Sequence, residues 1–418
     1  RLGTIADFFL RHDRPIARPM DDSVMAVCEG GPLMMRRGRG LSPYSLPLPG
    51  VPDGWLAAGA QMKSTVAVTA GGNAVMSSHI GDLDHEGAVR LWRRTVDDLA
   101  GLHGLDVVRA VADRHPDYAS TRGAAARPAP VESVLHHHAH LAACMAENGL
   151  DGPVLGIAWD GTGLGDDGTI WGGEFLAGTR ADSRRVAWLR PFPLAGGDAA
   201  AREPRRSALG VLREMGSVHP PPGFSPAELA VLDGMLQSGL NVARTSSAGR
   251  LFDAAASLLG VCQVMSHEGQ AAMRLEALAG GAEADPYPFG WIGDALDWAP
   301  MIAAMLAGGE TPARAAARFH ATLVEMMAAV ARRTGLADVC LSGGCFQNRR
   351  LLAGALRRLT AEGFRVWRHR EMPPNDAGIA LGQLAAAAAR RAVAGLAIGG
   401  ADMIECPRSS VAPEGERK

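Results

Sequence analysis

The stretch "PVLGIAWDGTGLGDDGTIWGGEFLAGT" occupies residues 153–179 and determines how the rest of the sequence is interpreted. An apolar run precedes its glycines and a second run begins at Ile170, so the pattern predicts two strands joined by a glycine-rich turn. Gly161, Gly163 and Gly165 leave backbone N–H groups accessible, and such groups can bind phosphate oxygens. The stretch is not a dinucleotide-binding fingerprint, because a strand rather than a helix follows the glycines. A plain glycine hairpin remains the alternative interpretation.

The same order of strand, turn and strand occurs earlier in the chain. Residues 55–81, "WLAAGAQMKSTVAVTAGGNAVMSSHIG", also predict strands joined by turns, and Lys63 lies in the first of these turns. Helices and further strands follow in each half. In the second half, residues 337–359 predict a strand, a glycine turn and a helix. Two halves built alike predict a duplicated α/β lobe, with the ligand site in the cleft between the lobes.

These patterns divide the chain into four parts. Residues 1–50 contain a predicted helix ("TIADFFLRH"), a strand and a basic loop, and they are interpreted as the end of another unit and a linker. Residues 51–150 are predicted to form the first lobe and residues 151–394 the second. Residues 395–418 lack periodicity, so we expect a flexible tail. Because the chain starts with arginine and no signal-like segment follows, we expect it to be a fragment of a longer protein.

Composition restricts the class of protein. The chain has 418 residues, 47% of them hydrophobic, and a formal net charge of −2, which fits a globular protein and argues against nucleic-acid binding. Its six cysteines are scattered without a C-x-x-C pair, which argues against a zinc ribbon or a disulfide framework. No apolar run reaches the ~20 residues that a membrane helix needs. A cytoplasmic protein is therefore expected.

Four histidines lie within five residues in the segment "HHHAH". If a helix starts near Leu135, His136 and His140 lie one turn apart on the same face, and this spacing lets two imidazoles bind one divalent metal ion. Asp376 in "MPPNDAGIALGQ" is a candidate third ligand. An Asn-Asp pair before an apolar helix is also an ordinary N-cap, so a purely structural interpretation of both segments stays open.

Two further stretches are candidates for ligand binding. In "CLSGGCFQN" the two glycines let a base or a ribose lie against the backbone, and Asn348 can hydrogen-bond it. Cys345 in the same stretch is better explained as a packed thiol than as a nucleophile, because no base is fixed beside it in the sequence. In "TSSAGRLFDA", Arg250 and Asp253 lie one turn apart, and an internal salt bridge explains them as well as ligand binding does.

Taken together and in this order, these stretches resemble the HypF family of carbamoyltransferases, which mature [NiFe]-hydrogenases. The resemblance covers residues from about Asp21 to Gln383 and rests on "GAQMKST", "SSHIGDLD", "DRHPDYAST", "HHHAH", "DGTGLGDDGTIWGGEF", "TSSAGRLFDA", "SHEGQAAMRLE", "RFHATL", "LSGGCFQN" and "PPNDAGIALGQ". It implies an α/β, two-lobed actin-like fold of the ASKHA (Hsp70 and sugar-kinase) type, duplicated and with helical insertions. Through "RPIARPMDDSV" and "RRGRG" it also implies that residues 1–50 are the end of a YrdC-like domain.

The family resemblance implies a reaction in two steps. A YrdC-like domain makes carbamoyl-adenylate from carbamoyl phosphate and ATP, and the actin-like domain passes the carbamoyl group to the C-terminal cysteine of HypE, where it becomes a cyanide ligand of iron. One divalent metal ion, iron or zinc, would be bound by His136, His140 and Asp376, which would also be the catalytic residues. The carbamoyl-adenylate would be bound by Lys63, Asp160, Gly161, Thr162, Gly163, Gly249, Asp253, Gly343, Gly344 and Asn348.

Two other functions remain open. An antibiotic O-carbamoyltransferase uses the same two domains in reversed order, and the YrdC-like segment before the actin-like part argues against it. The second is a nucleotide-binding regulatory protein of the actin-like fold without transferase activity. The chain has complete metal-binding and nucleotide-binding stretches, which argues against it. Neither a nucleic acid nor a membrane is expected as a partner. A carbamoyl-adenylate turnover assay would separate the enzyme from the regulator.

Overall fold

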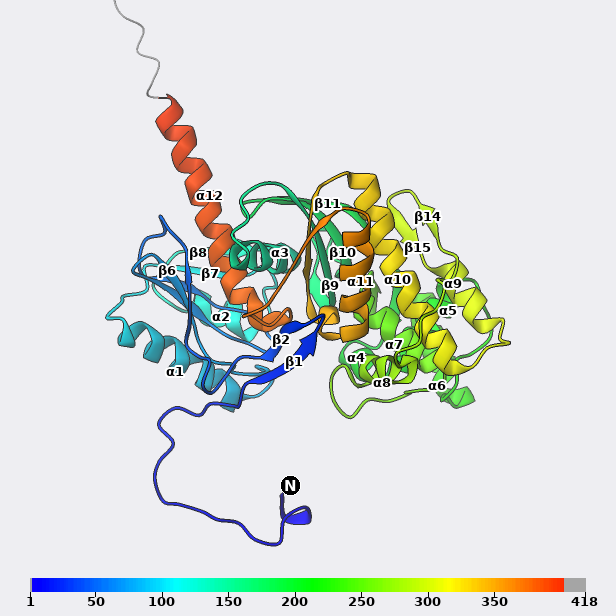
Figure 1. The fold of residues 1–418 in the computed structure, drawn as a ribbon. Helices are drawn as coiled ribbons and strands as arrows, with labels where there is room; N and C mark the ends of the chain where they lie inside the picture. The colour runs from blue at the N-terminus through cyan, green and yellow to red at the C-terminus, as the bar shows by residue number, and fades with distance from the viewer. Residues whose placement is uncertain (1, 402–418) are drawn as a thin grey trace, which may run out of the picture.

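The computed structural model describes residues 2–401 and contains two lobes, each built on its own sheet (Figure 1). The first sheet has the strand order β3-β6-β5-β4-β7-β8. Its strands are β3 (Tyr44–Pro47), β4 (Trp55–Ala57), β5 (Ala67–Ala70), β6 (Asn73–Met76), β7 (Arg109–Asp113) and β8 (Val131–Val134). The second sheet has the order β14-β15-β11-β10-β9-β16-β17, with β12 and β13 attached through β10. Its strands are β9 (Val154–Leu164), β10 (Ile170–Gly178), β11 (Ser183–Leu189), β12 (Phe192–Ala195), β13 (Val242–Thr245), β14 (Gly290–Ile292), β15 (Ala295–Asp297), β16 (Asp338–Ser342) and β17 (Arg365–Arg368).

The two sheets repeat one arrangement. In the first sheet, β4, β5 and β6 form an antiparallel meander, and β7 and β8 add in parallel on the other side of β4. In the second sheet, β9, β10 and β11 form the same meander, and β16 and β17 add in parallel beyond β9. The five strands therefore take corresponding places in both lobes. The duplicated α/β lobe predicted from the sequence is confirmed.

Alternate residues of β9 face helices on opposite sides of the second sheet. Leu155 and Ile157 pack in the large core of the second lobe. Val154 and Ala158 pack instead with residues of α3 (His136–Glu147). Because both faces are covered, the strand is apolar throughout its first half rather than alternating with polar residues. The even-numbered side of β9 therefore faces α3 as far as Asp160; beyond it the register with β10 shifts, and Gly163 faces α3 instead.

The helices α3 and α12 (Ile379–Ala401) join the two lobes. All residues of α3 from the first to the penultimate one are buried. The start of α12 packs along α3 and against the first sheet. A Cβ atom on Gly382 would lie 1.8 Å from the carbonyl oxygen of Ala139, so a glycine there permits the close approach of the two helices. The last helix, expected in the second lobe, therefore lies against the first.

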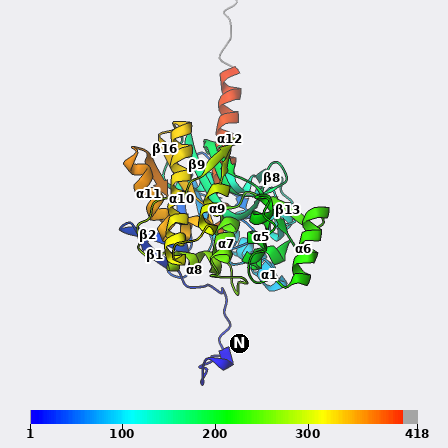
Figure 2. The same cartoon turned by 90° about the vertical axis from the view of Figure 1, so that its right-hand side faces the viewer.

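The C-terminal part of α12 extends away from both lobes (Figures 1 and 2). The helix continues to Ala401, beyond residue 395, where a flexible tail was expected to begin. The rest of that predicted tail, residues 402–418, lies outside the described residues.

Helices form the outer layers of both lobes. The first lobe carries α1 (Glu86–Leu102) and α2 (Ala119–Ala125). The helices of the second lobe are α4 (Asp198–Arg202), α5 (Pro204–Glu214), α6 (Pro226–Ser238), α7 (Ala248–Leu258), α8 (Gln270–Ala279), α9 (Ala299–Leu306), α10 (Pro312–Thr334) and α11 (Arg349–Ala361). Most of these lie between β12 and β16, so the predicted helical insertion is confirmed. Within residues 2–401, no helix is both long enough and apolar enough to cross a lipid bilayer.

The segment before the first lobe differs from its prediction. Residues 4–12, predicted as a helix, are exposed and form no helix apart from the end of a short 3-10 turn at Leu2–Thr4. They run away from the lobes (Figure 1), so their apolar side chains have no surface on which to pack, and a short isolated helix is marginal in water.

A hairpin connects this segment to both lobes. It consists of β1 (Val24–Cys28) and β2 (Gly31–Arg36), and its Cys28 and Leu33 side chains belong to the core of the second lobe. The chain then continues into β3, which is the edge strand of the first sheet. Residues 24–47 therefore contact both lobes.

Candidate functional site

Four side chains from three parts of the chain meet at the start of α3. His136 and His140 lie one turn apart at the beginning of this helix. Asp160 follows the buried half of β9, and Asp376 begins the 3-10 turn that leads into α12. The ligand-type atoms of the four residues all lie within 4.8 Å of one another. The three predicted metal ligands are thus brought together, and Asp160 joins them.

The distances and donor types in this four-residue cluster fit a divalent cation. Nε2 of His136 lies 3.5 Å from Asp160 Oδ2 and 3.7 Å from Asp376 Oδ1, and the corresponding distances from His140 Nε2 are 3.3 and 3.7 Å. Nε2 of His136 is buried and has no hydrogen-bond partner within the described chain, a situation that costs free energy unless a ligand satisfies it. Two imidazole nitrogens with two carboxylate oxygens suit zinc or iron.

Asp376 is available to the cluster because its neighbour caps the turn. The side-chain oxygen of Asn375 accepts the N–H of Ala377 at 3.0 Å. Its amide nitrogen donates to the carbonyl oxygen of Met35 at 3.2 Å. The N-cap interpretation of the Asn-Asp pair therefore applies to Asn375 alone.

The charges of the cluster stabilise one another. Burial opposes ionisation of Asp160, yet the neighbouring imidazoles of His136 and His140 hold the pKa of this carboxyl well below its usual range. Burial likewise opposes protonation of His136, but Asp376 and the hydrogen-bonded Asp113 raise its pKa well above the usual value. A divalent cation can take the place of the protons that these imidazoles would otherwise hold.

Asp160 reaches both the cluster and the neighbouring glycine turn. It was predicted only as a nucleotide-binding residue. Its Oδ2 atom faces the histidines, and its Oδ1 atom accepts the backbone N–H of Gly344 at 3.1 Å. The even-numbered side of β9 faces α3, and that alternation is the signal by which Asp160 could have been assigned to the cluster.

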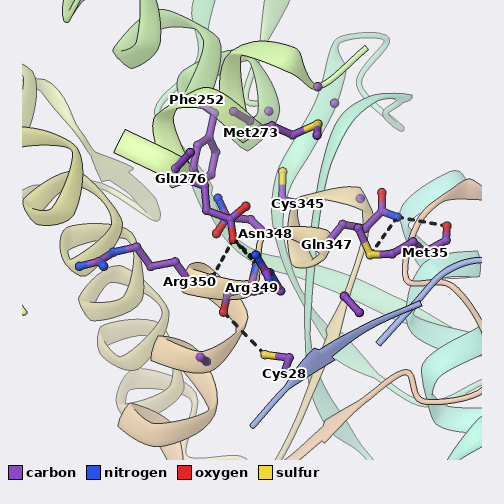
Figure 3. A pocket seen from close by; sticks show the side chains of 18 of the residues that line it. Cys28, Met35, Phe252, Met273, Glu276, Cys345, Gln347, Asn348, Arg349 and Arg350 are labelled. Atoms are coloured by element: carbon purple, nitrogen blue, oxygen red, sulfur yellow. Dashed lines mark hydrogen bonds and ion pairs between the residues drawn. The ribbon is translucent and has the colours of Figure 1, made fainter. Parts of the chain in front are cut away.

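A cavity of about 980 Å³ opens beside the cluster, between the second lobe and the β1–β2 hairpin, and Lys63 of the first lobe also lines it. Figure 3 shows it between second-lobe residues such as Phe252 and Glu276 and the β1–β2 hairpin, which carries Cys28 and Met35. The predicted binding residues that line the cavity are Lys63, Asp160, Gly161, Gly249, Asp253, Gly344 and Asn348. Within the described chain, Thr162, Gly163 and Gly343 are not among its lining residues.

The turn of the glycine hairpin lies later in the chain than predicted. Strand β9 includes Gly161 and Gly163, and the tight turn is formed by residues 165–169, where the N–H of Gly165 donates to the carbonyl oxygen of Thr169 at 2.9 Å. A Cβ atom on Gly163 would lie 2.5 Å from Cε1 of the His137 ring, so this glycine lets the strand pass beside the histidines. The turn predicted at 161–165 was misplaced, whereas contact of Gly161 with a phosphate stays a prediction.

The two glycines of "SGG", Gly343 and Gly344, have different structural roles. Gly343 has a φ of +101°, and a Cβ atom there would lie 2.1 Å from the carbonyl oxygen of Trp159, so only glycine fits. Gly344 donates its N–H to Asp160. Asn348 lines the cavity, but its amide is engaged within the protein, because it caps α11 through Leu351 and faces His320 Nε2 at 3.0 Å.

Lys63 and Cys345 both line the cavity, Lys63 as a charged side chain and Cys345 as a neutral thiol. Lys63 has a φ of +44° and forms an ion pair with Glu268 across the cavity. Burial disfavours its charge, but Glu268 raises the pKa of Lys63 overall, so the side chain is a cation. Burial raises the pKa of the Cys345 thiol well above its usual value. This supports the interpretation of Cys345 as a packed thiol.

Asp253 offers an unsatisfied oxygen to the cavity. Its Oδ2 atom lies 2.9 Å from Nη1 of Arg250, so the predicted salt bridge is present. That oxygen nevertheless has no hydrogen-bond partner with suitable geometry in residues 2–401. Burial raises the pKa of Asp253 to about 6. The salt-bridge interpretation is therefore confirmed, and ligand binding by Asp253 stays a prediction.

The pH dependence of stability is expected to report on Asp253. Its pKa is about 6 in the fold and roughly 3.9 in an unfolded chain, so the stability that this group contributes is present below about pH 4 and lost as the pH rises through 6. The loss is at most about 3 kcal/mol. The free energy of unfolding of Asp253→Asn, minus that of wild type, should therefore be larger at pH 7.5 than at pH 4. Urea unfolding at both pH values measures this, and a difference independent of pH would contradict it.

Two protein-family models match the chain. The model of the carbamoyltransferase Kae1-like domain, second subdomain, matches residues 156–383. The model of the HypF Kae1-like domain matches residues 51–147. These matches cover both lobes, including the four-residue cluster.

Similar curated proteins are carbamoyltransferases. The chain is 43% identical over 410 residues to carbamoyltransferase HypF of Rhodobacter capsulatus, an alignment that covers 93% of this chain and 54% of that protein. It is 40% identical over 369 residues to a carbamoyltransferase HypF homolog of Cupriavidus necator, covering 82% of this chain and 93% of that protein. The chain thus spans about half the length of the first relative and nearly all of the second.

Solved structures show the same fold. A crystal structure of full-length HypF in the phosphate- and nucleotide-bound form superimposes with a TM-score of 0.86 and 36% identity, covering 93% of this chain and 64% of that one. The structure of T. kodakarensis HypF gives a TM-score of 0.83 at 29% identity, covering 94% of this chain and 54% of that one. The predicted two-lobed actin-like fold is confirmed.

Proposed function

Since this chain belongs to the HypF carbamoyltransferase family, we propose that it transfers a carbamoyl group from carbamoyl-adenylate to the C-terminal cysteine of HypE. The observation that carries this proposal is the four-residue cluster beside a cavity large enough for a nucleotide, with Asp160 reaching both. The relatives favour this function over an antibiotic carbamoyltransferase or a regulatory protein.

The residues of the site would form two groups, one that binds the cation and one that binds the nucleotide. The cation would be held by His136, His140, Asp160 and Asp376. A bound divalent cation supplies Lewis acidity, which polarises a carbonyl group. Within the cavity, Lys63 would neutralise phosphate charge, and the Oδ2 atom of Asp253 would accept a ribose hydroxyl.

The proposed transfer forms one bond and breaks one. The thiolate sulfur of the acceptor cysteine attacks the carbamoyl carbon, a C–S bond forms, and the C–O bond to the phosphate breaks with its electron pair leaving on AMP. The thiol proton passes to solvent, because thiols ionise near neutral pH and need no dedicated base. The chain's own Cys345 is not the nucleophile in this scheme, because burial raises its pKa well above the usual value.

The proposal assigns only the transfer step to this chain. Residues 1–50, which would be the end of a YrdC-like domain, form no core of their own, because the β1–β2 hairpin packs on the second lobe and lines the cavity, and β3 pairs with the first sheet. Given carbamoyl phosphate and ATP, the chain should therefore release no pyrophosphate. A coupled pyrophosphate assay, with a full-length HypF as the positive control, measures this. Release at a rate comparable with the control would show that the adenylation site is misplaced.

A further inference from the structure

A row of buried polar side chains leads away from the cluster, starting at His140. Nδ1 of His140 lies 3.5 Å from the hydroxyl oxygen of Ser342. That hydroxyl lies 2.9 Å from Nε2 of His369, whose Nδ1 lies 2.6 Å from Oε2 of Glu147. All four residues lie in the interior, with the Glu147 side chain only 5% exposed. We call Ser342, His369 and Glu147 the relay.

The far end of the relay is an anchored carboxylate. The second oxygen of Glu147 accepts the backbone N–H groups of Arg370, Glu371 and Met372 at 2.8, 2.6 and 3.2 Å. Burial opposes the ionisation of Glu147, but His369 and these N–H groups hold its pKa below the usual value. An ionised carboxylate only accepts hydrogen bonds, so the end of the relay has a fixed polarity.

This polarity sets the direction of each hydrogen bond. Burial opposes protonation of His369, but neighbouring groups including Glu147 raise its pKa overall. Above that pKa the ring is neutral, Nδ1 donates to Glu147, and Nε2 accepts. Ser342 then donates its hydroxyl hydrogen to His369, and its oxygen accepts from Nδ1 of His140. The lone pair of His140 therefore lies on Nε2, the atom that faces Asp160 and Asp376.

The other histidine of the cluster is fixed in the same sense by a direct contact. Oδ2 of Asp113 lies 2.8 Å from Nδ1 of His136, while Oδ1 accepts the backbone N–H of His115 at 2.9 Å. Histidines that bind metals commonly donate their second N–H to a carboxylate, which fixes the ring and its tautomer. His136 has its carboxylate in contact, and His140 has its carboxylate three residues away along the relay.

On the basis of the proposed metal site, we propose that Ser342, His369 and Glu147 are positioning residues that fix the orientation and tautomer of His140 for cation binding. The relay is also linked to a second member of the cluster, Asp160. Ser342 directly precedes Gly343 and Gly344, and Gly344 donates to Asp160. A shift of Ser342 would therefore disturb two ligands of the cluster together.

The test measures the affinity for Co²⁺ alone, by competition with a chelator, and the visible absorption of the bound ion. Ser342→Ala and His369→Gln should each weaken Co²⁺ binding by about 10- to 100-fold and change the absorption bands, because His140 loses its fixed orientation. Ser342→Thr keeps the hydroxyl and should restore most of the affinity. The double variant should lose little more than one single variant does, because both changes interrupt one chain of hydrogen bonds.

The matched control is Ser183→Ala, which removes a serine hydroxyl 2.8 Å from Nδ1 of His138. His138 lies on α3, like His140, but is not part of the cluster. Ser183→Ala should leave Co²⁺ affinity unchanged. Wild-type affinity in Ser342→Ala, or an equal loss in Ser183→Ala, would overturn the relay while leaving the metal site in place. If the wild-type chain bound no Co²⁺, or if His136→Ala with His140→Ala kept full binding, the metal site itself would be wrong and the relay with it.

Discussion

Replacing both His136 and His140 by alanine is expected to remove the bound divalent cation and to slow carbamoyl transfer by about 100-fold or more. The two imidazoles supply half of the donor atoms of the four-residue cluster, and both come from one turn of α3. Without them only two ligands remain, Asp160 and Asp376, and two carboxylates are too few to hold a cation such as zinc. Elemental analysis of the purified variant, together with its transfer rate, measures the effect.

A neighbouring histidine provides the control for this variant. His138 lies on the same helix, but its ring contacts the Ser183 hydroxyl at 2.8 Å and the Arg180 carbonyl oxygen at 2.9 Å, away from the cluster. The folded fraction of the His138→Ala variant should therefore bind the cation with the same occupancy as wild type. Full metal occupancy in the His136→Ala, His140→Ala variant would rule out the cluster as the metal site.

The variant Gly382→Ala is expected to lower the free energy of unfolding by about 3 kcal/mol, the upper end of typical overpacking costs. The added Cβ atom would lie 1.8 Å from the carbonyl oxygen of Ala139, so α12 would have to move away from α3. The affected turn of α3 is the one that carries His140, so metal affinity should fall as well. Urea unfolding of the metal-free protein gives the stability, and a Co²⁺ titration gives the affinity.

The same helix offers a matched glycine. Gly395 also lies in α12, and no described atom lies within 4 Å of the Cβ atom that an alanine would add there. Gly395→Ala should stabilise the protein slightly, by about 0.5–1 kcal/mol, because alanine favours a helix over glycine. Equal effects of the two substitutions would contradict the close packing of α3 and α12.

Features that depend on local patterns could be predicted from the sequence. Each half of the chain opens with apolar runs separated by short turns, so the repeated strand, turn and strand order could be read before the pairing of the strands was known. The i, i+4 spacing places His136 and His140 on one side of any helix that contains them. These two inferences required no knowledge of neighbouring elements.

Features that depend on neighbouring elements were missed or misplaced. Gly161 and Gly163 look like turn residues, but they continue β9 because α3 and α7 pack closely beside them. The start of α12 is apolar on all sides, which predicts burial without saying against which lobe. Residues 4–12 have a helical pattern but no surface on which to pack. In each case the deciding contact is distant in sequence.

The most direct test of the central claim is a single-turnover transfer assay with this chain alone. The chain is loaded with a divalent metal, mixed with preformed carbamoyl-adenylate and HypE, and the mass of the HypE C-terminal peptide is measured. We expect one carbamoyl group on the terminal cysteine with AMP released in equal amount, and no such product from the His136→Ala, His140→Ala variant. A folded, metal-loaded wild-type chain that leaves HypE unmodified, or a variant as active as wild type, would contradict the claim.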